Sequence, residues 1–244
     1  MGPKDFAIFI YGLFMGTSTG YLKAKRSHFF PNKWEAIDDS FGVLTGGTCN
    51  CGVLRANGEI VLINTSRDLA AVELRRRIEG DLGASRSRIL VATSSDSEDV
   101  GGVDYFRNFV REKSDFEAAG EKIRIQNLGD NDLVYLTGRK ALFTGRFFYN
   151  AIHPPLREHG RDLKKWIAAL DEIQASFDAR LVIPAEGEVS DLSGVRSFRN
   201  YLQDFTDPAV TLETLREKYS EWGEIIGLTA LAENYEYARG IVVK

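Results

Sequence analysis

Residues 89–106 read ILVATSSDSEDVGGVDYF, and this stretch decides the fold class of the chain. It opens with four apolar residues, a pattern typical of a strand that is buried on both faces. A polar loop over residues 93–99 follows, and Gly101 and Gly102 end it. Beyond the two glycines, apolar residues recur at helical spacing, at Val103, Phe106, Phe109 and Val110. We therefore expect a buried strand, a polar loop at its carboxyl end, and then a helix.

The sequence on either side alternates strands with helices. The pair Asn57-Gly58 predicts a tight hairpin turn. Strands are expected at residues 41–44, 51–54, 59–63, 122–126, 133–136, 141–144 and 181–184. Helices are expected at residues 68–79, 161–177 and 195–205, and at 212–239 with a break at Gly223 or Gly227. This order predicts sheets covered by helices, although the pattern alone does not separate two sandwiched sheets from one doubly wound sheet.

The loop at residues 93–102 resembles the metal-binding loop of the metallo-β-lactamase superfamily, which reads T-H-x-H-x-D-H-x-G-G. Four further stretches match that family in order: the hairpins up to Asn64-Thr65, LFTGR at 142–146, NAIHP at 150–154 and IPAEG at 183–187. The resemblance covers about residues 34–205 and implies an α/β fold, a four-layer αββα sandwich. We expect an extension at 1–33, the domain at 34–210 and a helical segment at 211–244 packed on it.

The positions at which this family binds zinc carry other residues. The loop histidines are replaced by Ser94, Asp96 and Asp99, and its aspartate by Glu98. The bridging aspartate and the last histidine become Arg146 and Glu186. The whole chain has three histidines, His28, His153 and His159. Catalytic zinc needs about three protein ligands, mainly nitrogen or sulfur, and a permanently charged guanidinium repels a dication. We expect no metal and no cofactor, and hence no zinc hydrolase.

The replacement residues suggest two classes of function. In the leading hypothesis, the protein is a metal-independent biosynthetic enzyme that performs cyclisation, elimination or isomerisation on a small molecule. Arg146 would bind a substrate anion, and Glu186 or Asp99 would act as general base beside Asp96. His153 would be a general acid, or else a loop histidine bonded to the backbone. The strand ends of this fold converge, so the side chains of Arg146 and Glu186 are expected to lie close together.

The alternatives are a catalytically inactive scaffold or dimer partner and, third, a hydrolase with a hard cation on its carboxylates. In the scaffold, Arg146 and the acidic residues would form only structural ion pairs. In the hydrolase, Asp96, Glu98, Asp99 and Glu186 would supply oxygen ligands, although Arg146 argues against that site. Glu98 alternates with its neighbours and is expected to face solvent.

The composition limits the classes of partner that the protein is expected to bind and the cellular compartment in which it is expected to lie. The net charge of −4 attracts neither nucleic acid nor anionic lipid. Cys49 and Cys51 are expected to point to opposite sides, as reduced thiols of a cytoplasmic protein. The apolar residues 6–15 (FAIFIYGLFM) favour a buried strand or helix over a signal peptide, and they are too short to span a membrane. The apolar residues of 212–239 fit packing on the domain or a homo-oligomer surface.

Overall fold

The computed structural model describes residues 32–223 and 229–240, so the segment at residues 6–15 lies outside the described residues. Two sheets form the centre of the molecule. The first has the order β1-β2-β3-β4-β5-β6, with bounds Lys33–Ala36, Phe41–Thr45, Cys51–Ala56, Glu59–Ile63, Ser87–Val91 and Val110–Glu112. The second has the order β11-β10-β9-β8-β7, with bounds Leu181–Ile183, Ala141–Phe143, Asp132–Leu136, Glu121–Asn127 and Phe116–Ala118.

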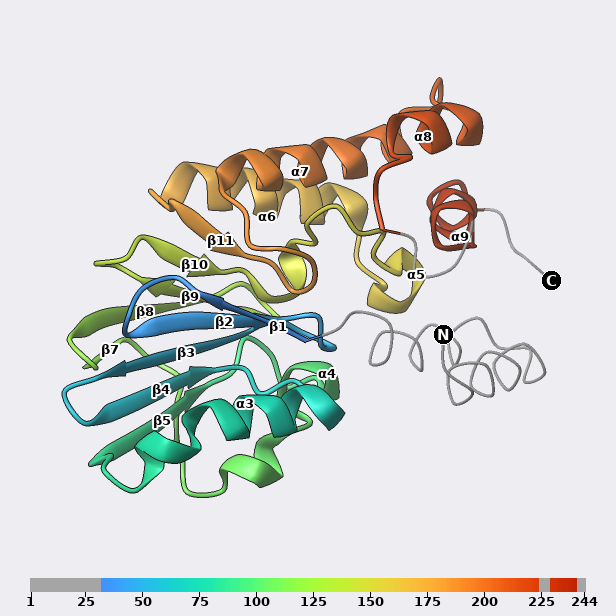
Figure 1. The fold of residues 1–244 in the computed structure, drawn as a ribbon. Coiled ribbons are helices and arrows are strands. Elements are labelled where there is room, and N and C mark those ends of the chain that lie inside the picture. The colour runs from blue at the N-terminus through green and yellow to red at the C-terminus, as the bar shows by residue number, and fades with distance from the viewer. Residues whose placement is uncertain (1–31, 224–228, 241–244) are drawn as a thin grey trace, which may run out of the picture.

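The two sheets pack face to face between layers of helices (Figure 1). Helix α3 (Asp68–Leu82) covers the first sheet, and α6 (Leu163–Ser176) with α7 (Leu192–Thr206) covers the second. A core between the sheets joins residues of both, among them Val43, Val61, Ile123 and Phe143. The architecture is therefore the expected αββα sandwich, which places the loops at the strand ends along one edge of both sheets.

Local sequence signals explain several of these elements. Asn57 and Gly58 both have positive φ angles, 54° and 73°, as the hairpin between β3 and β4 requires. The side chain of Asp162 accepts hydrogen bonds from the backbone amides of Lys164 and Lys165 and so starts α6. The apolar stripe of this helix is buried as predicted, from Trp166 to Ile173.

The region after Gly102 differs from the expectation of a helix. A short α4 (Ser97–Val100) lies within the loop, a 3-10 turn follows at Val103–Phe106, and Val110 starts strand β6. Val110 pairs with Ile89 of β5 and is exposed, so it does not share a buried face with Phe106. Backbone pairing with the sheet outweighs the helical spacing here. Strand β7 was not predicted, and α3 buries Leu74 and Ile78 while leaving Leu69 and Val72 exposed.

The two C-terminal helices lie beside the α6/α7 layer. Helix α8 (Leu212–Lys218) ends earlier than the expected break, and α9 (Thr229–Ala238) lies near α5 (Leu156–His159) (Figure 1). Asn234 of α9 accepts a hydrogen bond from the backbone N–H of Leu156 at 3.0 Å and donates one to the carbonyl of Pro154 at 2.7 Å. These bonds fasten α9 to the chain that leads into α5.

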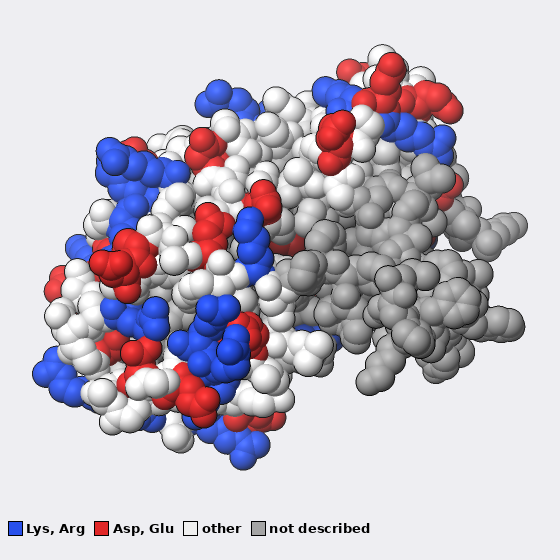
Figure 2. Space-filling view, in the orientation of Figure 1, with Lys and Arg blue, Asp and Glu red and all other residues white. Residues whose placement is uncertain are grey.

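The surface shows mixed charge. On the face drawn in Figure 2, basic and acidic side chains alternate rather than gathering into one large patch of a single sign. Within residues 32–223 and 229–240, no helix combines the length and the hydropathy needed to cross a bilayer.

Candidate functional site

The loop that follows β5 is fixed to the end of β4 by Asn64. This residue is buried, with a φ of 62°, and its side-chain oxygen accepts the backbone N–H of Thr93 at 2.8 Å. Its amide group also donates to the hydroxyl of Thr93 at 3.0 Å. The amides of Thr65 and Ser66 donate to the carbonyl of Asp99 at 2.8 and 3.1 Å. The loop is thus held at both ends. The sequence did not indicate that Asn64 fixes one of them.

Arg146 is positioned from the second sheet. It lies in a 3-10 turn, Gly145–Phe147, just after β10, where Gly145 has a φ of 50°. The buried side chain of Asn131 accepts the backbone N–H of Arg146 at 3.1 Å and donates to the carbonyl of Thr144 at 3.0 Å. A side chain on Gly145 would meet Asn131 at 2.4 Å. The turn therefore needs glycine, and Asn131 is a positioning residue that no motif indicated.

Arg146 and three carboxylates of the β5 loop form one ion-pair cluster, called here the Arg146 cluster. The guanidinium bonds Asp96 at 2.7 Å, pairs closely with Glu98, and lies 4.0 Å from the carboxylate of Asp99. Only 18% of the Arg146 side chain, 7% of that of Glu98 and 1% of that of Asp99 is exposed. The structure thus brings Arg146, Asp96 and Asp99 together as expected, and it buries Glu98, which was expected to face solvent.

Short-range bonds set the direction of each acidic side chain. Asp96 caps α4 by accepting the backbone N–H of Glu98 at 3.0 Å. The hydroxyl of Ser94 donates to the carboxylate of Asp99 and accepts the backbone N–H of Asp96 at 3.0 Å. Because the N-terminus of a helix favours negative charge, the short α4 helps to keep these carboxylates together.

The cluster changes the proton affinity of its members. Burial alone would lower the pKa of Arg146, but its electrostatic interactions with Tyr149 and with Asp99, Glu98 and Asp96 raise the pKa above its ordinary value. Burial raises the pKa of Asp99, although the bond from Ser94 and the charge of Arg146 act in the opposite direction. Arg146 therefore carries a permanent charge, while the pKa of Asp99 is higher than that of an ordinary aspartate.

This raised pKa of Asp99 predicts a specific pH dependence of stability. Between the ordinary carboxyl pKa and the raised value, the folded chain holds a proton that the unfolded chain has lost, so the stability from this group falls as pH rises. Asp99→Asn cannot titrate. Wild type should therefore gain stability relative to Asp99→Asn as the pH is lowered from about 7 to about 4. Urea unfolding of both proteins measures the difference, and a constant or opposite trend would contradict the assignment.

Glu186 does not join the Arg146 cluster. Strands β10 and β11 are parallel neighbours, and the carbonyl of Glu186 accepts the backbone N–H of Asn150 at 3.1 Å. The strand ends therefore converge as expected. In the part of the chain that the structure describes, however, Glu186 is not among the carboxylates within 4.0 Å of Arg146. Among the described residues, Arg146 thus pairs with the β5 loop and not with Glu186, because the turn at Gly145 directs its side chain there.

Glu186 instead lines a cavity of about 400 Å³ at the ends of β2 and β11. Small residues make much of its wall, namely Gly46, Gly47, Ala151, Gly187 and Gly223. Ala151 has a φ of 52°, an uncommon angle for a residue with a side chain. Asn50 closes the wall by donating hydrogen bonds to the carbonyls of Pro184 and Gly187 at 3.1 and 2.8 Å. We call this space the Glu186 pocket.

The histidines occupy other places. His153 is buried against Tyr201 and Trp222, and its Nδ1 lies 3.1 Å from the hydroxyl of Tyr201 rather than at the Arg146 cluster. Its proposed role as a general acid has no support from this position. His159 is half-buried, with its Nε2 2.7 Å from the hydroxyl of Tyr149. Each histidine contacts a tyrosine, Tyr201 for His153 and Tyr149 for His159. Neither tyrosine stands at a helix or strand spacing from its histidine, so the sequence did not indicate these contacts.

The two cysteines are buried in the core under α3. Their sulfur atoms lie 3.9 Å apart, so the expectation that they point to opposite sides is wrong. Residues two apart share a face of an extended chain. Burial raises the pKa of Cys49 well above its usual value, which keeps it a thiol rather than a nucleophilic thiolate.

The residues at the family's zinc position do not fit zinc. The loop supplies carboxylates and a hydroxyl, and two of the carboxylates directly contact a guanidinium that stays charged. Zinc prefers nitrogen and sulfur ligands. Across residues 32–223 and 229–240, no group of three or more His, Cys, Asp or Glu side chains is arranged to hold a metal ion.

Comparisons with known proteins find this architecture among solved structures. No family model matches the chain, and no curated protein matches it. A metallo-beta-lactamase from Pontibacter korlensis is 18% identical, with a TM-score of 0.62, over 71% of this chain and 99% of that one. The DIM-1 metallo-beta-lactamase is 15% identical, with a TM-score of 0.57, over 70% and 97%. TMB-1 is 14% identical, with a TM-score of 0.58, over 72% and 99%. At these identities the likeness concerns the fold.

Proposed function

Because the chain has the metallo-β-lactamase fold but places a guanidinium among the carboxylates of its β5 loop, we propose that it is a metal-independent protein that binds and converts a small molecule in the Glu186 pocket. The single observation that carries this proposal is the pocket itself. It is large enough for a metabolite, and a largely buried carboxylate lines it.

The charges of the pocket define the kind of ligand. Lys33 and Glu188 lie at its rim and pair with each other at 3.2 Å, so their charges cancel. Glu186 adds a largely buried carboxylate to the wall. We propose a ligand with a hydrogen-bond donor or a positive charge at the end that meets Glu186 and an apolar body against the small residues.

Glu186 is also the group proposed to move a proton. A carboxylate within hydrogen-bond reach of a substrate can act as a general base, which suits an elimination, an isomerisation or a cyclisation. The side chains of Asn50 and Asn150 line the same wall and would orient the substrate through their amide oxygens, because their NH2 groups already donate to backbone carbonyls. Arg146 and Asp99 have no contact with the ligand in this proposal; they keep the β5 loop in place.

A second candidate function is a non-catalytic scaffold. The observation that favours it is the closed Arg146 cluster, which ties the β5 loop to the second sheet at the place where the family does its chemistry. A scaffold would keep this cluster for stability and would not need Glu186. The two candidates therefore differ in the expected effect of changing Glu186.

Glu186→Gln and Glu188→Gln make a matched pair of variants, because both lose one negative charge in the same pocket. A thermal-shift screen of wild type with a library of small metabolites, amines included, identifies a stabilising ligand. We expect Glu186→Gln to weaken its binding about tenfold or more and to abolish turnover, with little change in Glu188→Gln, whose side chain is 79% exposed. Equal effects of both changes, or a screen without any ligand, would favour the scaffold.

A further inference from the structure

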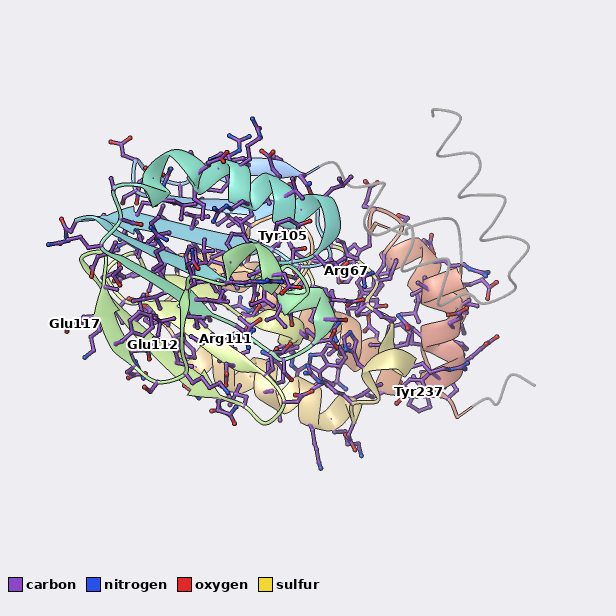
Figure 3. The ribbon with its side chains drawn as sticks, turned by 90° about the horizontal axis from the view of Figure 1, so that it is seen from below. Arg67, Tyr105, Arg111, Glu112, Glu117 and Tyr237 are labelled. Carbon is purple, nitrogen blue, oxygen red and sulfur yellow. The ribbon has the colours of Figure 1, made fainter. Side chains whose placement is uncertain are left out.

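A second cavity lies at a different place in the molecule. It measures about 480 Å³ and opens between the end of the first sheet, at β5 and β6, and the turn between β8 and β9 of the second. Its walls include Ser94, Ser95, Arg111, Glu112, Lys113, Asn127 and residues 129–132. None of these residues lines the Glu186 pocket. Figure 3 labels Arg111 and Glu112, which lie on β6.

The carboxylates on one wall of this cavity already have partners. Asp130 receives hydrogen bonds from Nη2 of Arg161 at 2.9 Å to both carboxylate oxygens. Asp132 accepts a hydrogen bond from the amide of Asn127 at 2.7 Å. Arg161 therefore balances the charge of Asp130, whereas Asp132 keeps its negative charge and is bonded by a neutral amide.

The cations on the other wall are not satisfied in this way. Arg111 and Lys113 are two residues apart at the edge of the first sheet, and both line the cavity. Among the described residues, neither of them has an ion pair within 4.0 Å. Glu112 is the one acidic residue between them, so the wall carries a net positive charge. A guanidinium and an ammonium on one wall are the groups that proteins use to bind carboxylates and phosphates.

We propose that this cavity, called here the Arg111 pocket, binds a small organic anion that carries a carboxylate or phosphate group. Arg111 and Lys113 bind the charged group, and the hydroxyl of Ser95, which lines the same cavity, donates a further hydrogen bond. Two residues of the pocket also hold the Arg146 cluster, because Ser94 donates to Asp99 and Asn131 accepts the backbone N–H of Arg146. An anion bound here would therefore stabilise the β5 loop through Ser94 and Asn131. This site is independent of the function proposed for the Glu186 pocket.

Calorimetric titration of the full-length protein with citrate and with inorganic phosphate, at constant ionic strength, tests the proposal. We expect saturable binding of at least one of the two anions, and the stronger of them shows which group the pocket prefers. The double variant Arg111→Met/Lys113→Met should bind about tenfold more weakly or worse. The matched control is Lys122→Met/Arg124→Met, which removes the same charge at the same spacing from exposed positions of β8 outside the pocket.

A gain of binding gives an independent check. Glu112→Gln removes the one acidic side chain beside the two cations and should strengthen binding of the same anion. Thermal melts of all variants establish that they are folded. The proposal is overturned if neither anion binds saturably to wild type. It is also overturned if the control double variant loses as much affinity as the pocket variant, because the effect would then be one of net charge alone.

Discussion

Arg146→Met is expected to lower the free energy of unfolding by about 3–5 kcal/mol. The change removes the guanidinium that lies beside the buried carboxylates of Glu98 and Asp99. An uncompensated buried charge is costly, because the protein interior solvates it poorly. The loop after β5 would also lose its link to the second sheet. Urea unfolding at neutral pH measures the loss.

Two further variants make this prediction specific. Adding Glu98→Leu to Arg146→Met removes a buried charge from the same cluster and should recover a large part of the loss. Arg107→Met is the matched control, because Arg107 pairs with Asp104 on the exposed surface at 3.2 Å. That pair should contribute about 1 kcal/mol or less. A loss in Arg146→Met no larger than in the control would show that the cluster is not a structural replacement for a metal.

Truncation after Phe205 is expected to abolish soluble expression or to remove most of the stability. The deleted segment includes Leu215, Tyr219 and Leu231, which are buried against the core of α6 and α7. Each such side chain contributes about 1.5–3 kcal/mol when it is buried, so their combined loss approaches the stability of a typical domain. The ring of Trp222 also stacks on Tyr201, and the ring of Tyr219 meets Tyr201 edge to face, so the truncation would expose Tyr201.

A single substitution in α9 tests the packing of this helix without removing any part of the chain. Asn234→Ala leaves the backbone N–H of Leu156 without its side-chain acceptor in a buried place, which should cost about 1–3 kcal/mol. Glu233→Ala, on the same helix, removes a side chain that is not fully buried and should change stability little. A truncated chain that stays soluble with unchanged melting temperature would contradict the packing seen here.

The fold was predictable because its signals are local and repeated. The positions of the hairpin at Asn57-Gly58 and of the stripe on α6 follow from turn chemistry and periodicity, and both are found where expected. The error at Val110 arose because a helical spacing of four apolar residues continued into an edge strand. Strand pairing is a long-range interaction, so the sequence around Val110 contains little information about it.

The candidate site was predictable only in part. The resemblance of the β5 loop indicated that Arg146, Asp96 and Asp99 lie together, and they do. It could not indicate which carboxylate faces the guanidinium most closely, because that depends on the turn at Gly145 and on the cap of α4. Asn131 holds Arg146 through a backbone contact that has no sequence signature. The turn that follows a strand sets the direction of the side chains at the strand end. The turn at Gly145 directs Arg146 toward the β5 loop and not toward Glu186.

We propose that Arg146 takes the place of the metal in this fold. Elemental analysis of the full-length protein, purified without chelators, incubated with zinc and then dialysed, tests it most directly. A guanidinium contacting Asp96 and Glu98 should exclude a dication, so the account predicts no stoichiometric zinc, manganese or magnesium after dialysis. About one zinc ion per chain, lost in a variant of the β5 loop carboxylates, would contradict the account.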